Sequence, residues 1–124
     1  MQTFLPYKDF NKSLQSLDWR RLGKQRVEAK QILNVLLGRT ETKGWRNHPI
    51  TRMWAGYESA LQLYFNLCVK EWVRRGYNNN MELEDIPDTI EYPHWLGNDM
   101  FHSSHRANLL RKDSEFYSTE GWNE

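Results

Sequence analysis

Cysteine and long apolar runs are almost missing from this sequence of 124 residues. With Cys68 as its one cysteine, the chain has neither an intrachain disulfide nor a metal cluster held by several thiolates. No apolar run approaches the roughly 20 residues of a membrane span, and the start, MQTFLPYKDF, lacks the apolar core of a signal peptide. We therefore expect a protein of a reducing cytoplasm with no membrane partner.

Low-complexity segments and internal repeats are missing as well. Hydrophobic residues make up 39% of the chain and aromatic residues 14%, with six tryptophans, which is typical of a folded domain and not of a disordered segment. A length of 124 residues is usual for one domain. We therefore expect residues 1–124 to form a single domain, and we expect it to act as a monomer.

Net charge is small for the whole chain but not for its halves. Residues 1–56 hold 11 Lys and Arg against 4 Asp and Glu, a balance of +7, whereas residues 57–124 hold 6 against 12, a balance of −6. Charged residues often do no more than solvate a surface, but separation on this scale favours an anionic partner for the basic half. Nucleic acid is the partner that this pattern suggests.

Apolar spacing predicts an all-α, compact single domain of three main helices with irregular loops, since no stretch alternates as a strand does. The first main helix is expected over 18–37, with Asp18 as its N-cap. The second is expected to follow Pro49 and to run to about Arg75, and the third is expected over 98–113.

Three residues mark further local features. A short helix is expected from about Asp9, and Gly38 is expected to stop the first main helix. Gly23 lies inside that helix, where glycine lowers helix stability. Either the helix is weak at that turn or another group approaches it closely.

The stretch RRLGKQRVEAKQIL, residues 20–33, is strongly basic and contains a single acid, Glu28. On a helical wheel Arg21, Lys24 and Glu28 share one polar row opposite the apolar stripe. Lys24 and Glu28 suit an ordinary exposed ion pair at i,i+4. Alternatively, Glu28 is the acid/base of a site whose cations, Arg20 and Arg21 among them, hold an anionic polymer. Phosphate would repel a carboxylate that faces DNA, so its presence there needs a chemical reason.

The stretch GWRNHP packs Trp45, Arg46, Asn47 and His48 together before the second main helix. It is typical of a helix-capping turn. It also suits a DNA contact in which Arg46 and His48 bind phosphate and Asn47 reads a base edge. Trp45 and Trp19 adjoin basic residues, so they are the tryptophans best suited to stack on a base.

The stretch HSSHR places His102 and His105 three residues apart near the end of the chain. That spacing can chelate a metal, but the signal is weak without acid or cysteine ligands nearby, and we expect no metal and no cofactor. Phosphate contacts are the favoured interpretation, with candidates His105, Arg106, Arg111 and Lys112.

Three longer blocks carry a resemblance to a known family. They are MQTFLPY with LDWRRLGKQRVEAKQIL, then GWRNHPITRMWAGYESALQLY with EWVRRGY, and last PHWLGNDMFHSSHRANLLRKD. Together they span most of the chain and resemble the short bacterial and phage branch of the pyrimidine-dimer DNA glycosylase (phage endonuclease V-like) family. The resemblance implies an all-α fold, double-stranded DNA as partner, and excision of a damaged or modified base such as a pyrimidine dimer. The resemblance also allows an abasic-site lyase activity, which would cut the DNA strand after the base has left. If a phage carries the gene, we expect the protein in the cytoplasm of the host.

The resemblance also implies which residues react. In that family a glutamate on the first long helix, six residues after a leucine, works with the α-amine of the N-terminal residue, which attacks C1′ of the damaged nucleotide and forms an imine. Leu22 and Glu28 reproduce the spacing. Because Gln2 is too bulky for efficient removal of Met1, the nucleophile is the amine of Met1, the side chain of Lys24 or water. If it is the amine, the first residues must fold back over the helix to reach Glu28.

Two other functions stay open beside this one. The first is a nucleic-acid-binding domain that has the same scaffold and no chemistry. The second is a nuclease that cuts phosphodiesters, which is disfavoured because the sequence contains no acidic metal cluster.

Overall fold

The structure is a computed structural model that describes residues 2–40 and 45–124. In that part of the chain all regular structure is helical, which confirms the all-α prediction. The three long helices are α2 (Trp19–Leu36), α4 (Glu58–Arg74) and α5 (Asp99–Lys112). The short elements are α1 (Phe10–Ser16), α3 (Pro49–Trp54), α6 (Ser114–Tyr117) and two 3-10 turns, η1 (Trp45–Asn47) and η2 (Ser118–Glu120).

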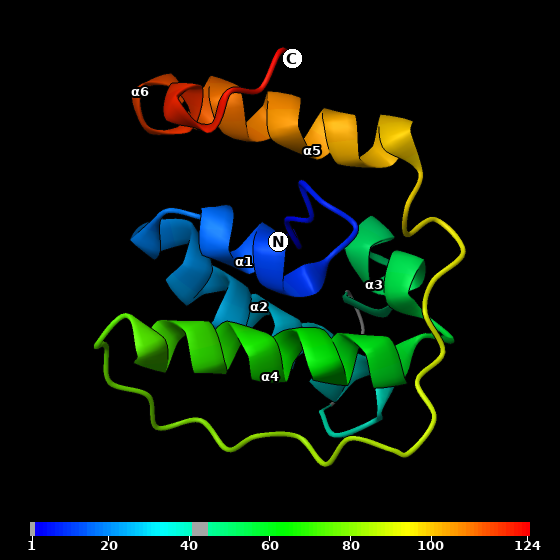
Figure 1. Cartoon of the computed structure of the whole chain (residues 1–124). Helices are drawn as coiled ribbons and strands as arrows, with labels where there is room; N and C mark the ends of the chain where they lie inside the picture. The colour runs from blue at the N-terminus through cyan, green and yellow to red at the C-terminus, as the bar shows by residue number, and fades with distance from the viewer. Residues whose placement is uncertain (1, 41–44) are drawn as a thin grey trace.

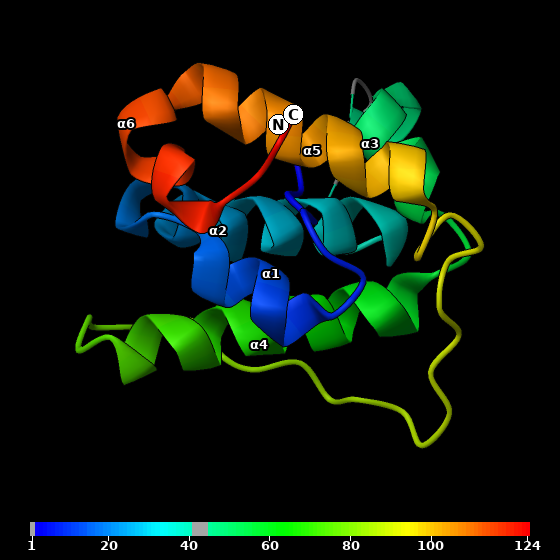
Figure 2. The same ribbon diagram turned by 45° about the horizontal axis from the view of Figure 1, so that its top comes forward.

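The helices form three layers (Figure 1). One outer layer is α4, the middle layer is α1 with α2, and the other outer layer is α5 with α6. The order is the same after the molecule is turned by 45° (Figure 2). Between α2 and α4 the core is fully buried at Leu22, Ile32, Leu61 and Tyr64. Over the described residues, no helix combines the length and the apolarity that a bilayer crossing needs.

Helix starts and stops follow the side chains that the sequence provides. Asp9, Asp18 and Asn98 are the N-caps of α1, α2 and α5, and each accepts a hydrogen bond from a backbone N–H of the first turn. Gly38 has a φ of 70° just after α2, a conformation that glycine adopts without strain. The predicted start of α1 and the predicted bounds of α2 and α5 are therefore confirmed to within a residue or two.

The prediction of one continuous helix from Pro49 to Arg75 is wrong. The chain forms α3, leaves the helical conformation at Ala55, and starts α4 after Tyr57. Gly56 between them has a φ of 88°, which lies in the left-handed region. The apolar spacing continues across this break, so periodicity alone does not reveal it.

Gly23 lies within α2, and the helix continues through it. A Cβ atom at this position would lie 3.0 Å from the ring of Trp72 on α4. Of the two alternatives for Gly23, the close approach of another group is the correct one.

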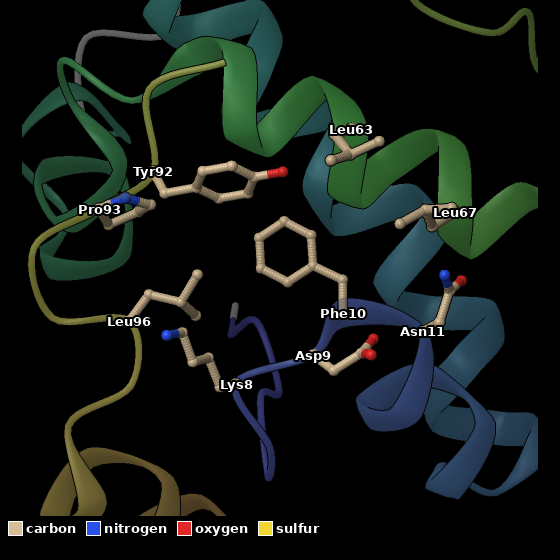
Figure 3. A pocket seen from close by; sticks show the side chains of 9 residues that line it. All are labelled: Lys8, Asp9, Phe10, Asn11, Leu63, Leu67, Tyr92, Pro93 and Leu96. Atoms are coloured by element: carbon tan, nitrogen blue, oxygen red, sulfur yellow. The ribbon is translucent and has the colours of Figure 1, made fainter.

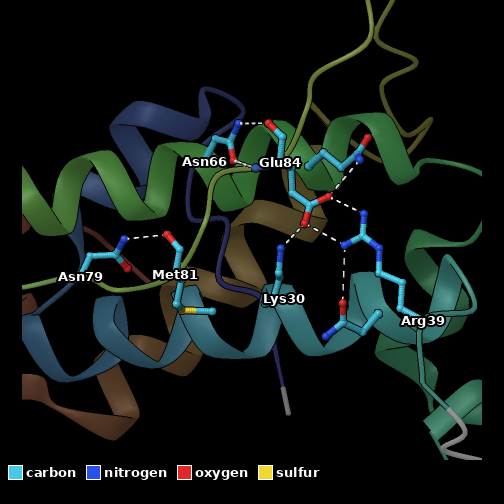
Figure 4. Close-up of polar contacts among 8 residues, drawn as sticks. Lys30, Arg39, Asn66, Asn79, Met81 and Glu84 are labelled. Atoms are coloured by element: carbon cyan, nitrogen blue, oxygen red, sulfur yellow. Dashed lines mark hydrogen bonds and ion pairs between the residues drawn. The ribbon is translucent and has the colours of Figure 1, made fainter.

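The acidic loop after α4 is attached to α2 and α4 through Glu84 (Figure 4). Its carboxylate accepts hydrogen bonds from Lys30, from both Nη atoms of Arg39 (2.8 and 2.9 Å) and from Gln62 (3.1 Å). Asn66 bonds both the N–H and the C=O of Glu84. The hydrogen bonds from Arg39 outweigh burial and lower the pKa of Glu84 to about 2. Part of the charge separation seen in the sequence is therefore neutralised inside the fold.

Candidate active site

The N-terminal segment, residues 2–6, forms neither helix nor strand and lies between α2 and α5 (Figure 2). The side-chain amide of Gln25 accepts from Phe4 N–H and donates to the Gln2 carbonyl, both at 2.8 Å. On the other side, Nδ1 of His105 accepts from Leu5 N–H at 2.8 Å. Two helices thus hold the segment by its backbone.

Aromatic side chains of α3 and α4 support the same arrangement. The hydroxyl of Tyr64 lies 2.6 Å from Oε1 of Gln25 and 3.0 Å from the Phe4 carbonyl. Nε1 of Trp54 donates to Oγ1 of Thr3 at 3.1 Å. Since Tyr64, Trp54, Gln25 and Thr3 are all buried, these bonds fix the register of the segment on α2.

Glu28 lies at the free end of this segment. Gln2 N–H donates to Oε2 of Glu28 at 3.0 Å, so the backbone nitrogen of Gln2 lies against the carboxylate. Met1 itself is outside the described residues. The expectation that the first residues fold back over the first long helix is confirmed as far as Gln2.

A cavity of about 460 Å³ opens beside Glu28, a size usual for small-ligand sites. Its lining comes from the N-terminal segment, the first half of α2 and the end of α5. Four of the cations that the sequence singled out meet here. They are Arg20, Arg21, Lys24 and Lys112; Gln2, Phe4, Gln25, Glu28 and Asp113 complete the lining.

The cations around this cavity are not equivalent. Arg21 forms an ion pair with Asp18 at 3.1 Å, whereas Arg20, Lys24 and Lys112 are exposed. Among the described residues no ion pair joins Lys24 to Glu28, so the ordinary i,i+4 pair does not explain the acid. The carboxylate of Glu28, which accepts a hydrogen bond from Gln2 N–H, therefore lies in the wall of a cavity whose rim carries exposed cations.

His105 and Arg106 hold the N-terminal segment. Burial, with the neighbouring His102 second, lowers the pKa of His105 to about 4, so its ring is neutral and accepts from Leu5. His102 accepts from Gly97 N–H through Nε2, so its Nδ1 donates to the Leu5 carbonyl at 2.7 Å. A phosphate contact through His105 does not fit a ring that is buried and already bonded.

Arg106 donates to the Pro6 carbonyl at 2.8 Å and forms an ion pair with Glu124 at 2.9 Å. Its charge is therefore partly used inside the fold. Arg111 is exposed near the end of α5. In the part of the chain that is described, no group of three or more His, Cys, Asp or Glu side chains is placed to hold a metal ion.

The GWRNHP stretch lies elsewhere. Of the described residues that line the Glu28 cavity, none comes from η1 or α3. Arg46 and Asn47 are exposed, and Nδ1 of His48 accepts from Ile50 N–H at 3.2 Å, which caps α3. His48 thus has the capping role, and the side chain of Trp45 is outside what the structure describes.

A larger hollow of about 660 Å³ lies between α1, α4 and the loop before α5 (Figure 3). Its wall is mostly apolar, with Phe10, Leu63, Leu67 and Leu96, and Tyr92 stands at its edge. None of the site residues that the sequence singled out lines it. The candidate acid/base Glu28 and four of the candidate DNA-binding or nucleophilic cations line the smaller cavity instead.

Sequence reasoning missed Gln25, which bonds the N-terminal segment more than any other side chain. One signal was available: Gln25 lies three residues after Leu22 and four before Ala29, on the buried stripe of α2. A polar amide in such a stripe must find hydrogen-bond partners. That rule predicts a bonded Gln25 but does not name its partners.

Comparison with known proteins gives one match. A family model described as pyrimidine dimer DNA glycosylase matches residues 1–85, which contain α1 to α4 and Glu28, whereas α5 lies beyond the match. No curated protein and no solved structure matches the chain significantly.

Proposed function

The chain belongs to the pyrimidine dimer DNA glycosylase family, and on that premise we propose that the amine of Met1 and the carboxylate of Glu28 excise a damaged base in the cation-lined cavity. As a DNA glycosylase, the protein binds DNA and releases a base from it. The observation that carries the proposal is the 3.0 Å hydrogen bond from Gln2 N–H to Glu28. Only two backbone atoms separate that nitrogen from the α-amine of Met1.

An α-amine suits this chemistry because its pKa is low for an amine. At about 7.7–8.0, roughly a tenth of it is unprotonated at neutral pH, whereas a lysine at about 10.4 needs strong desolvation to match it. The amine attacks C1′, the glycosidic bond breaks, and the base leaves with the bonding electrons. Glu28 takes the proton from the amine and stabilises positive charge on the sugar.

The covalent product then permits strand cleavage. The sugar ring opens as the C1′–O4′ bond breaks, which leaves an imine between C1′ and the amine. Loss of a 2′ proton with departure of the 3′ phosphate is the lyase step. We assign these protons to Glu28 because it is bonded to Gln2 N–H, whereas the other acid in the cavity lining, Asp113, caps α6 by accepting from Phe116 N–H at 3.3 Å.

The exposed cations Arg20, Lys24 and Lys112 are suited to the phosphates on either side of the reacting nucleotide. We propose a pyrimidine dimer or a related lesion in double-stranded DNA as the substrate. The lesion must leave the base stack to place its C1′ beside Glu28.

Borohydride trapping on DNA with an abasic site tests the nucleophile, and mass spectrometry locates the adduct. We expect the adduct on the peptide that begins with Met1. An adduct on Lys24 would move the nucleophile one turn along α2, and base release without an adduct would indicate water. Neither adduct nor release over a panel of damaged duplexes would favour the non-catalytic binding domain.

Glu28→Gln tests the acid/base on UV-irradiated duplex DNA. The variant should lose base release on the order of 100- to 10,000-fold and still bind the duplex. Glu115→Gln, which changes an exposed glutamate on α6, is the matched control and should excise at the normal rate. Unchanged excision by Glu28→Gln would remove Glu28 from the mechanism.

A further inference from the structure

A chain of hydrogen bonds joins α6 to the wall of the Glu28 cavity through the start of α2. The hydroxyl of Tyr117 on α6 donates to Oδ1 of Asp18 and accepts from Asp18 N–H at 3.0 Å. The same Oδ1 accepts from Nη1 of Arg21 at 3.1 Å, and Arg21 lines the cavity. Asp18 and Tyr117 are buried, and only 22% of the Arg21 side chain is exposed. The fold therefore holds Arg21 in place, unlike the three exposed cations of the rim.

The hydroxyl of Tyr117 is itself fixed. Its ring is buried and stacks on Trp122, with centroids 5.6 Å apart and 10° between the planes. Nε1 of Trp122 in turn donates to the Tyr7 hydroxyl at 2.7 Å. Burial would raise the pKa of Asp18, but hydrogen bonds from Tyr117 and Arg21 outweigh it and lower the pKa, so the carboxylate is charged at neutral pH. A charged carboxylate on a fixed hydroxyl restricts the guanidinium to one position.

Arg21 and Glu28 lie on the same face of α2. They are almost two full turns apart, so their side chains leave the helix within about 20° of each other and about 10 Å apart along the axis. Asp18 bonds one terminal nitrogen of the guanidinium, and among the described residues no acceptor bonds its Nε or Nη2. The planar fork of a guanidinium matches two oxygens of a phosphate. The remaining donors of Arg21 are thus available to a phosphate in the cavity.

We propose that Arg21 binds a phosphate next to the reacting sugar and so fixes the sugar beside Glu28, and that Asp18 and Tyr117 are positioning residues that act through Arg21. The inference rests on the proposed DNA glycosylase function. Tyr117 lies beyond residues 1–85, which the family model matches, so membership of the family assigns it no role.

A cation that is already paired adds little to affinity, because it releases few counterions when DNA binds. A cation held in one position, however, orients a bound nucleotide without reorganising during the reaction. Arg21 should therefore affect the rate of base release more than the affinity for DNA. The exposed cations of the rim should affect the affinity more than the rate.

Single-turnover base release and affinity, both measured on a duplex with one pyrimidine dimer, test the proposal. Arg21→Ala should slow release on the order of 100-fold. Tyr117→Phe keeps the stacked ring without its hydroxyl and should slow release about 10-fold. Asp18→Ser keeps an N-cap for α2 and loses the carboxylate, so it should slow release at least as much as Tyr117→Phe. All three should bind within about threefold of wild type, whereas Lys112→Ala should weaken binding and react normally once bound.

A double variant separates positioning from a general effect on stability. If Tyr117 acts through Arg21, adding Tyr117→Phe to Arg21→Ala should slow release no further. Tyr57→Phe is the matched control, since the Tyr57 hydroxyl also bonds a side chain, that of His94 at 3.1 Å, and Tyr57 does not line the cavity. It should release the base at the normal rate.

Normal release by Arg21→Ala would overturn the proposal. So would a loss of affinity as large as the loss of rate, or losses that multiply in the double variant. Failure of the proposed function has a different signature, because wild type would then release no base from the damaged duplex.

Discussion

Replacing Gln25 with leucine should release the N-terminal segment from α2 without unfolding the domain. The amide makes two hydrogen bonds of 2.8 Å to the segment, at Phe4 and Gln2, and a third of 2.6 Å to Tyr64. Leucine keeps a similar volume and offers neither donor nor acceptor. A buried polar group that loses its partner costs about 1–3 kcal/mol. Tyr64 keeps the Phe4 carbonyl as an acceptor, so we expect the free energy of unfolding to fall by roughly 2–4 kcal/mol.

A domain of this size has a free energy of unfolding of about 5–15 kcal/mol, so most of the Gln25→Leu protein stays folded. The amide of Phe4 should exchange its hydrogen much faster, because its acceptor is gone. Single-turnover base excision should slow on the order of 100-fold, since Gln2, and with it the proposed amine nucleophile, is no longer held by α2. Gln25→Glu keeps the acceptor for Phe4 and loses the donor to Gln2, so it should lie between the two proteins.

Gln31→Leu is the control for the chemistry of the substitution, because Gln31 lies six residues further along α2 and is exposed. It should leave exchange at Phe4 and the excision rate unchanged. The reasoning would be refuted if Gln25→Leu kept both a protected Phe4 amide and the normal excision rate. In that case other contacts, such as that of His105 with Leu5, would be sufficient to hold the segment.

Stability should fall as the pH is lowered from about 6.5 to about 4, because in this range the unfolded chain protonates His105 while the folded protein, with a His105 pKa of about 4, does not. The free energy of unfolding should fall by roughly 3 kcal/mol over this range, and urea unfolding at each pH measures it. His105→Asn retains an acceptor for Leu5 N–H and should remove this part of the pH dependence. Affinity for duplex DNA should fall steeply with salt, and Lys112→Ala should reduce the slope of log K against log salt by about one. Lys70→Ala, on the exposed side of α4, should leave that slope unchanged, and a similar effect of both variants would argue against the Glu28 cavity as the DNA site.

The helix ends that the sequence predicted correctly are those with local causes. Asp18 and Asn98 cap their helices through a backbone N–H three residues on, and Gly38 stops α2 by its own conformation. The break at Gly56 also has a local cause, but the apolar pattern on either side hid it. Periodicity shows which face is buried, and it does not show whether the chain leaves the helix for two or three residues.

Part of the candidate site could likewise be predicted from the sequence, and part of it could not. Glu28 could be singled out from the sequence because it is the one acid in a basic row of a single helix. The bond from Gln2 to Glu28 joins residues 26 positions apart, and the bond from Leu5 to His105 joins residues 100 positions apart. Such contacts depend on how α5 packs over the N-terminal segment. Neither propensity nor spacing in the sequence contains that information.

The number of charged residues in the sequence does not predict which cations are available to bind DNA. The basic half of the sequence suggested a broad anion-binding surface, yet Lys30 and Arg39 are bound to Glu84, and Arg21 is bound to Asp18. A cation that is already paired releases few counterions when DNA binds, so it adds little to affinity. The cations that remain exposed at the rim of the cavity are Arg20, Lys24 and Lys112. Internal pairing therefore removes Lys30, Arg39 and Arg21 from the count of available cations, and the three exposed cations of the rim lie where a phosphate chain must lie if C1′ is to reach Glu28.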